Sequence, residues 1–429
     1  MTRHTFLSLF SAALLLVSCH SSRSLQDTGT STGSLPDPSL TPVVRPRPAP
    51  PKRPAPSRPQ DPDCRRMAQR LDSLMGDPWL ETSQLGLYVF DLTANAPVFD
   101  KGARQRMRPA STMKIVTATV ALAQLGTEYQ YATRLYIDGT QQGNTLKGNL
   151  YVKAGFDPLL GYNDLNAFAD ILAAKGIRRI QGKLILDTSI KDGKEFGWGW
   201  CWDDDNPSLS PLLYNGKPDF SPNFLQALSR KGITLTGNTA EGRVPSSAQA
   251  VAVCQRPIAD VLRPMMKQSD NLDAESMFYQ IAAQTGVPGA GRRQASECIR
   301  LFINGQLTLP ADNYLIADGS GLSLYNYVTP ELLVGMLRYA YAHPDIYRSL
   351  LSSLPVAGRD GTLKNRLHNT AAQGNIAAKT GTVTGICSLA GYATAANGHR
   401  LCFAIINQGQ AKASQARLFQ DKVCRLMTE

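Results

Sequence analysis

Three short motifs along the chain contain residue types that could carry nucleophilic catalysis. In the first, Ser111 and Lys114 stand three residues apart at the start of an apolar helical pattern, so their side chains point the same way. A serine hydroxyl needs a base at neutral pH, and a neutral lysine amine could take its proton. Burial beside another cation, such as Lys379, would keep that amine neutral. Taken alone, the pair could equally be a helix-capping serine and a surface lysine.

The other two motifs follow in the order Ser269-Asp270-Asn271 and Lys379-Thr380-Gly381. The first is weak alone, because Ser221-Pro222-Asn223 also fits Ser-x-Asn, although its proline and setting indicate a plain helix start. The second lies on a predicted strand, where the cation and hydroxyl could hold a substrate carboxylate and Gly381 would let a substrate backbone approach closely. Alone it could be an edge-strand lysine before a turn. All three motifs in this order favour a serine active site.

Elements from both ends of the chain must position these motifs. Hydrophobic periodicity and turn residues predict helices and strands that flank the motifs. The expected helices are 64–75, 111–126 and 411–427, and the expected strands are 85–91, 97–100, 378–384, 387–394 and 400–407. Because strands come from both ends of the chain, we expect a sheet closed by distant segments with the terminal helices beside it.

A different unit is expected between residues 131 and 254. It contains strand-like segments at 145–155 and 182–189, a helix-like stretch at 165–175 and a tryptophan-rich turn at 197–205. We therefore predict an inserted domain over 131–254 within a main domain formed by 63–130 and 255–429.

The first 62 residues are not expected to contribute to the fold. Arg3 precedes an apolar run from Phe6 to Val17 that is too short to span a bilayer permanently and ends in Leu16-Val17-Ser18-Cys19. This pattern resembles a bacterial lipobox and predicts a signal peptide over 1–19 with lipidation at Cys19; an ordinary signal peptide is the alternative. Eleven prolines between Leu35 and Pro62 predict an extended tether over 20–62. We expect a cell-envelope protein anchored to a membrane and facing the periplasm.

Cysteine and histidine usage gives little sign of a metal site. Seven cysteines remain beside Cys19, and Cys64 and Cys424 could pair as a disulfide or equally be small buried hydrophobes. The five histidines are scattered and no Cys-x-x-Cys pair occurs. We therefore expect no metal and no cofactor. The sequence leaves the oligomeric state open.

The ordered motifs are those of penicillin-binding proteins and class A β-lactamases. The chain resembles the class C low-molecular-mass penicillin-binding proteins, peptidase family S13, over nearly all of 63–429. Further similarity lies in GNLYVKAGFDPLL, GIRRIQGKLILD, LRPMMKQSDNLDAESMF, ADGSGLS and LPVAGRDGTLKNRL. The resemblance implies an α/β (α+β) penicillin-binding/β-lactamase-like fold. Its features would be a five-stranded antiparallel sheet with helices on both faces, a helical active-site subdomain and an inserted α/β domain.

The resemblance also implies a D-alanyl-D-alanine carboxypeptidase, with or without endopeptidase activity, that acts on peptidoglycan stem peptides. Ser111 would be acylated by the penultimate D-Ala carbonyl with Lys114 as base. Ser269 would relay a proton to the leaving amine, and Asn271 would hold the substrate amide.

The remaining implied roles concern the strand of the third motif. Lys379 and Thr380 would bind the terminal carboxylate beside Gly381, and the N–H groups of Ser111 and Thr382 would form the oxyanion hole. β-Lactam antibiotics would be covalent inhibitors. The net charge of +11 suits the carboxylates of peptidoglycan, and we expect no nucleic-acid partner for an exported lipoprotein.

Three departures from the family and two rival functions stand beside this prediction. Phe156 precedes Asp157-Pro158 where the family tends to have glycine, and the inserted segment is shorter than in the best-known members. A long proline-rich lipid tether is also not a standard part of the family. A β-lactamase would share the acylation step, but class A β-lactamases lack the insert. A non-catalytic lipoprotein that binds the wall is the second rival, and the intact motifs argue against it.

Overall fold

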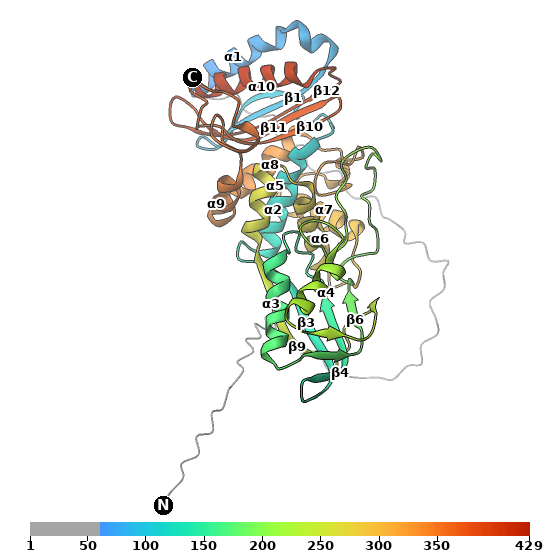
Figure 1. Ribbon diagram of the computed structural model, residues 1–429. Helices are drawn as coiled ribbons and strands as arrows, with labels where there is room; N and C mark the ends of the chain where they lie inside the picture. The colour runs from blue at the N-terminus through green and yellow to red at the C-terminus, as the bar shows by residue number, and fades with distance from the viewer. Residues whose placement is uncertain (1–60) are drawn as a thin grey trace, which may run out of the picture. The chain divides into compact units, whose positions relative to one another are not determined.

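A computed structural model of the chain describes residues 61–429 (Figure 1). These residues belong to one compact unit that contains two β-sheets and three hydrophobic cores. Within this part of the chain, no helix combines the length and apolar character needed to cross a membrane. Cys19 and the predicted signal peptide lie outside the described residues, as does nearly all of the predicted tether.

The first sheet has five antiparallel strands drawn from both ends of the chain, as the sequence predicted. The N-terminal strand β1 pairs along its full length with β12, from Gln84 opposite Gln408 to Asp91 opposite Leu401. The spatial order is β10-β11-β12-β1-β2. The strands are β1 (Gln84–Asp91), β2 (Ala96–Lys101), β10 (Ala377–Val383), β11 (Ile386–Thr394) and β12 (Arg400–Gln408).

Helices cover both faces of this sheet because its strands alternate between two cores. Leu87 and Val89 of β1 pack into the core that holds the terminal helices α1 (Pro62–Ser73) and α10 (Ala413–Thr428). Phe90 of β1 packs into the larger helical core, where α8 (Pro330–Ala342) lies against β12 and β1. Figure 1 shows α10 and α8 on opposite faces of the sheet. The predicted five-stranded sheet with helices on both faces is confirmed.

The terminal helices differ by a few residues from their predicted bounds. Helix α1 begins at Pro62, the last residue of the predicted tether, because Asp61 caps it by accepting hydrogen bonds from the N–H groups of Asp63 and Cys64. Cys64 and Cys424 are both buried free thiols in the core between the terminal helices and the sheet. The possible disulfide is therefore not formed, and the alternative of buried small hydrophobes describes both residues.

The helical part below the sheet carries the first two motifs. Helix α2 is buried on nearly every face, as its dense apolar sequence predicted. The helices that build this part are α2 (Met113–Leu125), α5 (Ile258–Lys267), α6 (Asn271–Ala283), α7 (Arg292–Gln306) and α9 (Pro344–Ser353).

The second sheet lies between α2 and α5 in the sequence and has its own hydrophobic core with α3 (Tyr162–Ala174) and α4 (Phe220–Arg230). Its long strands are antiparallel, and its short strands run parallel to β4 or to one another. They are β3 (Gln130–Gln142), β4 (Thr145–Lys153), β5 (Arg179–Gln181), β6 (Leu184–Asp187), β7 (Thr234–Leu235), β8 (Thr239–Glu241) and β9 (Gln249–Pro257). The division into a main domain and an inserted domain over 131–254 stays a prediction.

Candidate active site

Ser111 lies in a 3-10 turn, Ala110–Thr112, that leads directly into α2. One helical turn later, Lys114 Nζ lies 3.0 Å from Ser111 Oγ. The structure therefore brings the two residues of the first motif together as their spacing predicted. Lys114 is fully buried, whereas Ser111 is half-buried.

The hydrogen-bond partners of Lys114 define how its amine is oriented. Besides Ser111 Oγ, Nζ contacts Asn271 Oδ1 at 2.7 Å and the backbone oxygen of Ser320 at 2.8 Å. Both of these oxygens can only accept hydrogen bonds. A neutral amine has two N–H groups, which the two acceptors would engage, and its lone pair then faces the Ser111 hydroxyl. This is the orientation that a general base for Ser111 requires.

The electrostatics of the site allow the neutral form of the Lys114 amine to be populated. Burial lowers the pKa of Lys114 to about 8, although the charges of Asp318 and Glu275 oppose this shift. The sequence predicted that burial beside another cation, such as Lys379, would have this effect, and burial is the main cause. Burial, assisted by the charge of Lys114, in turn holds the pKa of Lys379 well below its usual value.

A buried carboxylate shell behind Lys114 was assigned no role from the sequence. Glu275 accepts hydrogen bonds from the backbone N–H groups of Gly319 (3.1 Å) and Ser320 (2.9 Å), and burial raises its pKa to about 8. Asp318 accepts from the N–H of Gly321 at 2.8 Å. These contacts fix the loop whose Ser320 oxygen meets Lys114. The sequence signal was the similarity of two segments to the family: LRPMMKQSDNLDAESMF, which contains Glu275, and ADGSGLS, which contains Asp318.

The second and third motifs meet through Ser269 and Lys379. Lys379 is fully buried, and its Nζ donates hydrogen bonds to Ser269 Oγ at 2.8 Å and to the backbone oxygen of Thr380 at 2.7 Å. Ser269 has a φ of +69°, a left-handed conformation that costs a non-glycine residue about 1–2 kcal/mol. The surrounding contacts hold Ser269 in this strained conformation, which places its hydroxyl beside Lys379.

Strand β10 carries the third motif at the open edge of the first sheet. A Cβ added to Gly381 would lie 2.2 Å from Ser388 Oγ, 2.9 Å from the backbone nitrogen of Ser111 and 3.0 Å from the oxygen of Pro109. The glycine is thus required by the protein's own packing at the Ser111 turn, in addition to the predicted close approach of a substrate.

A cleft of about 550 Å³ opens where the three motifs converge. Lys114 and Lys379 are buried and reach it through their hydrogen bonds to Ser111 and Ser269. Thr380 Oγ1 donates to Thr362 Oγ1 at 2.7 Å, which forms a pair of hydroxyls in the cleft. The lining residues are Ser111, Ser269, Thr362, Asn365, Arg366, Thr380, Gly381, Thr382, Cys387, Ser388 and Arg417. The sequence predicted no role for Thr362 or Arg417. Thr362 lies in the LPVAGRDGTLKNRL segment that resembles the family, whereas Arg417 lies outside the motifs and the quoted segments.

Phe156, the departure from the family pattern, has a φ of +47° and is fully buried. Its backbone oxygen accepts a hydrogen bond from Ser276 Oγ at 2.6 Å. The preceding Gly155 oxygen accepts from Gln280 Nε2 at 2.6 Å. This segment therefore supports α6, the helix that begins with Asn271. The positive φ explains why glycine would suit the position.

Comparison with known proteins agrees with the geometry. The model of the D-Ala-D-Ala carboxypeptidase 3 (S13) family matches residues 67–212 and 209–429. The chain belongs to this S13 family. D-alanyl-D-alanine carboxypeptidase DacB of Haemophilus influenzae is 26% identical and aligns with 79% of this chain and 90% of its own. A D-alanyl-D-alanine carboxypeptidase of Actinomadura sp. is 26% identical over 80% of this chain and 81% of its own.

The fold assignment has independent structural support. The crystal structure of penicillin binding protein 4 of H. influenzae superposes with a TM-score of 0.74 at 24% identity, covering 84% of this chain and 97% of that one. This similarity confirms the predicted penicillin-binding fold of the S13 member described here. The roles of the individual site residues stay predictions.

Proposed function

We propose that this S13 protein hydrolyses D-Ala-containing peptides of peptidoglycan through an acyl-enzyme on Ser111. The observation that carries the proposal is the Lys114 amine, which is buried, has a lowered pKa and lies 3.0 Å from Ser111 Oγ. In the first step Lys114 would take the Ser111 proton while Oγ attacks the penultimate D-Ala carbonyl. The developing oxyanion would accept hydrogen bonds from the N–H groups of Ser111 and Thr382. Ser111 lies on the turn and Thr382 on the strand, and the turn and the strand approach each other at Gly381.

Collapse of this intermediate requires a proton for the leaving amine. Ser269 Oγ lines the cleft and already accepts from Lys379 Nζ, so Ser269 would donate its proton to the amine while Lys379 restores it. Asn271 has its Oδ1 engaged by Lys114, which leaves its Nδ2 free to donate to a substrate carbonyl. Exchange through solvent would then move the proton from Lys114 back to Lys379, which returns both amines to their starting states. Water would deacylate Ser111 with Lys114 again as base.

The substrate carboxylate would lie at the hydroxyl pair of Thr380 and Thr362. Lys379 is fully buried and engaged with Ser269, so it would act through Ser269 more than by a direct contact with the carboxylate. Arg417 lines the same cleft and would add a cation that attracts the carboxylate. After the first residues of β10, the outer edge of this strand would let the substrate peptide pair with it as an added strand.

The location of the protein is also part of the proposal. The lipobox-like sequence that ends in Cys19 supports an exported lipoprotein, anchored to a membrane and facing the periplasm, and the proline-rich segment would let it reach the wall. Metabolic labelling with an acyl-chain analogue, compared between the parent and a Cys19→Ala variant, tests the anchor. Equal labelling of both proteins would refute it.

The decisive experiment follows the intact mass of the full chain with a penicillin over time, beside Ser111→Ala. A lasting adduct of one drug molecule that the variant lacks supports the acyl-enzyme. An adduct that disappears while the drug is consumed supports a β-lactamase, and no adduct in either protein supports a non-catalytic wall-binding role. Release of free D-Ala from pentapeptides, compared with cleavage of cross-linked dimers, then separates carboxypeptidase from endopeptidase activity.

A further inference from the structure

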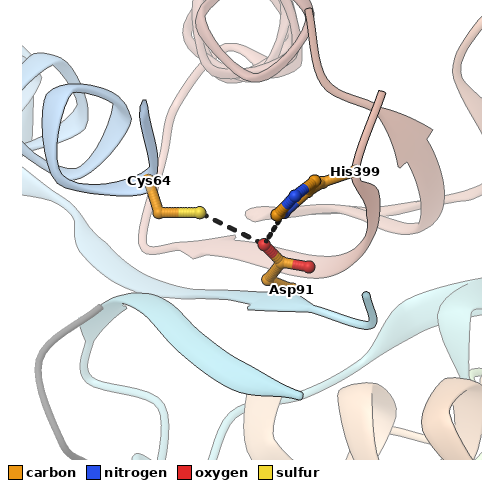
Figure 2. Close-up of side chains that lie close together, drawn as sticks. All are labelled: Cys64, Asp91 and His399. Carbon is orange, nitrogen blue, oxygen red and sulfur yellow. Dashed lines mark hydrogen bonds and ion pairs between the residues drawn. The ribbon is translucent and has the colours of Figure 1, made fainter. Parts of the chain in front are cut away.

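A cluster of three potential metal ligands lies on the first sheet, apart from the three catalytic motifs. Cys64 is in the first turn of α1, Asp91 is the last residue of β1, and His399 is in the turn between β11 and β12. Figure 2 shows the cysteine and histidine side chains both directed at the carboxylate of Asp91. Among residues 61–429 this is the only such group of three that the side chains form.

The distances within the cluster are close to those around a bound ion. Cys64 Sγ and His399 Nδ1 lie 3.1 Å and 2.7 Å from the same oxygen, Asp91 Oδ2, and all three ligand atoms lie within 4.8 Å of one another. A tetrahedral zinc ion with bonds of about 2.0–2.3 Å separates its ligand atoms by roughly 3.3–3.5 Å. To admit zinc, each hydrogen bond would lengthen by about half an ångström, and the sulfur and the nitrogen, which lie within 4.8 Å of each other, would take the same spacing of roughly 3.3–3.5 Å.

Neighbouring contacts hold the ligands in place. Asp91 Oδ1 accepts hydrogen bonds from the N–H groups of Thr93 (2.8 Å) and Ala94 (2.9 Å), which directs Oδ2 to the cluster. The N–H of Cys64 donates to the Asp61 cap at 3.1 Å. Such supporting bonds orient metal ligands and increase affinity.

The burial of the cluster leaves one side accessible. Cys64 and Asp91 are 2% and 0% exposed, whereas the His399 side chain keeps 24% of its surface. An ion could enter from the histidine side and keep a water molecule there. One sulfur, one nitrogen and one oxygen ligand form a set that suits zinc better than calcium or magnesium, which take oxygen ligands.

We propose that Cys64, Asp91 and His399 bind one zinc ion, with water as the fourth ligand. Binding releases the Cys64 thiol proton and the Nδ1 proton of His399, which now contacts Asp91, to solvent; His399 then carries its single proton on Nε2, so that the Nδ1 lone pair faces the metal. The ion would connect α1, β1 and the β11–β12 turn, three segments distant in sequence. Its effect would be to stabilise the first helix against the sheet, independently of the chemistry at Ser111.

The test uses zinc chloride alone, titrated calorimetrically into the full chain purified in detergent and stripped with a chelator. We expect one zinc per chain, with Cys64→Ser and His399→Gln weakened at least about a hundredfold, since loss of a mere outer-shell partner costs roughly 10–100-fold. Cys298→Ser, at a partly exposed thiol on α7, is the matched control and should bind like the parent.

Two further measurements would distinguish a zinc site from a hydrogen-bond network of the same three residues that binds no metal. Cobalt in place of zinc should give a thiolate charge-transfer band that Cys64→Ser lacks, and zinc should raise the unfolding temperature of the parent but of neither ligand variant. Absence of saturable binding, or equal binding by the parent and both variants, would overturn the proposal. Penicillin acylation of Ser111 should be the same with and without zinc, so either proposal can fail without the other.

Discussion

The Nζ atom of Lys114 lies 2.7 Å from Oδ1 of Asn271, a residue 157 positions away in the sequence. Through this contact the second motif fixes the base of the first. The amide oxygen takes one amine hydrogen and the Ser320 oxygen, at 2.8 Å, takes another, which directs the lone pair to Ser111. The base is therefore oriented by tertiary contacts and not by the helix alone.

The rate of acylation should depend on the neutral fraction of Lys114. Because burial lowers the pKa of this amine to about 8, the rate with a chromogenic β-lactam should rise as the pH rises through about 8 and level off above it. Glu275, whose pKa is also raised to about 8, contributes to the same transition, so the kinetic pKa belongs to the pair. A rate that falls over this range would contradict the role of Lys114 as base.

Replacement of Glu275 by glutamine should lower that kinetic pKa. The carboxylate raises the pKa of Lys114, and the amide oxygen can still accept from the Gly319 and Ser320 N–H groups. The measurement is the same pH profile, and Glu297→Gln, on α7, is the control that should leave it unchanged. A profile that moves to higher pH would rule out this electrostatic contribution.

Substitution of Gly381 by alanine should reduce acylation at least about a hundredfold, the usual effect of displacing reacting groups by about 1 Å. The new Cβ would meet the backbone nitrogen of Ser111 at 2.9 Å, in addition to Ser388 Oγ at 2.2 Å. Removal of the Ser388 hydroxyl in the double variant Gly381→Ala/Ser388→Ala should restore little, because the contact with Ser111 remains. Full recovery of acylation in the double variant would show that only the contact with the Ser388 side chain causes the loss.

Arg417→Gln should raise KM for peptides with a free terminal carboxylate, because Arg417 is exposed and lines the cleft. Exposed ion pairs contribute about 0.2–1 kcal/mol, so we expect a change of roughly 1.4- to fivefold that shrinks at high salt. Steady-state release of D-Ala provides the measurement, with Arg348→Gln on α9 as the control. An unchanged KM would show that Arg417 does not contribute to binding of the substrate carboxylate.

Phe156→Gly should destabilise the fold although it relieves a strained backbone. Relief of the left-handed conformation at φ +47° returns about 1–2 kcal/mol, while loss of a fully buried phenylalanine costs roughly 3–5 kcal/mol. Urea unfolding should therefore show a net loss of about 1–4 kcal/mol. The control is Asn95→Gly, at an exposed turn with φ +50°, which should lose no stability. If Phe156→Gly also loses none, the buried phenylalanine does not stabilise this segment.

Local patterns in the sequence determined the five-stranded sheet, its terminal helices and the identity of the three motifs. Alternation of apolar residues and helical spacing depend on the geometry of single elements, so strands such as 400–407 and the pair Ser111–Lys114 were predictable. The spacing of three residues alone placed the lysine beside the serine.

Only the tertiary structure decided the environment of those residues. The burial of Lys114, the support of its loop by Glu275, the hydroxyl pair of Thr380 and Thr362, and the cluster at Asp91 all join segments far apart in sequence. The physical reason is that desolvation and hydrogen bonding depend on which surfaces meet in space. Sequence spacing does not encode such meetings, and the scattered cysteines and histidines therefore gave no sign that Cys64 and His399 share one carboxylate.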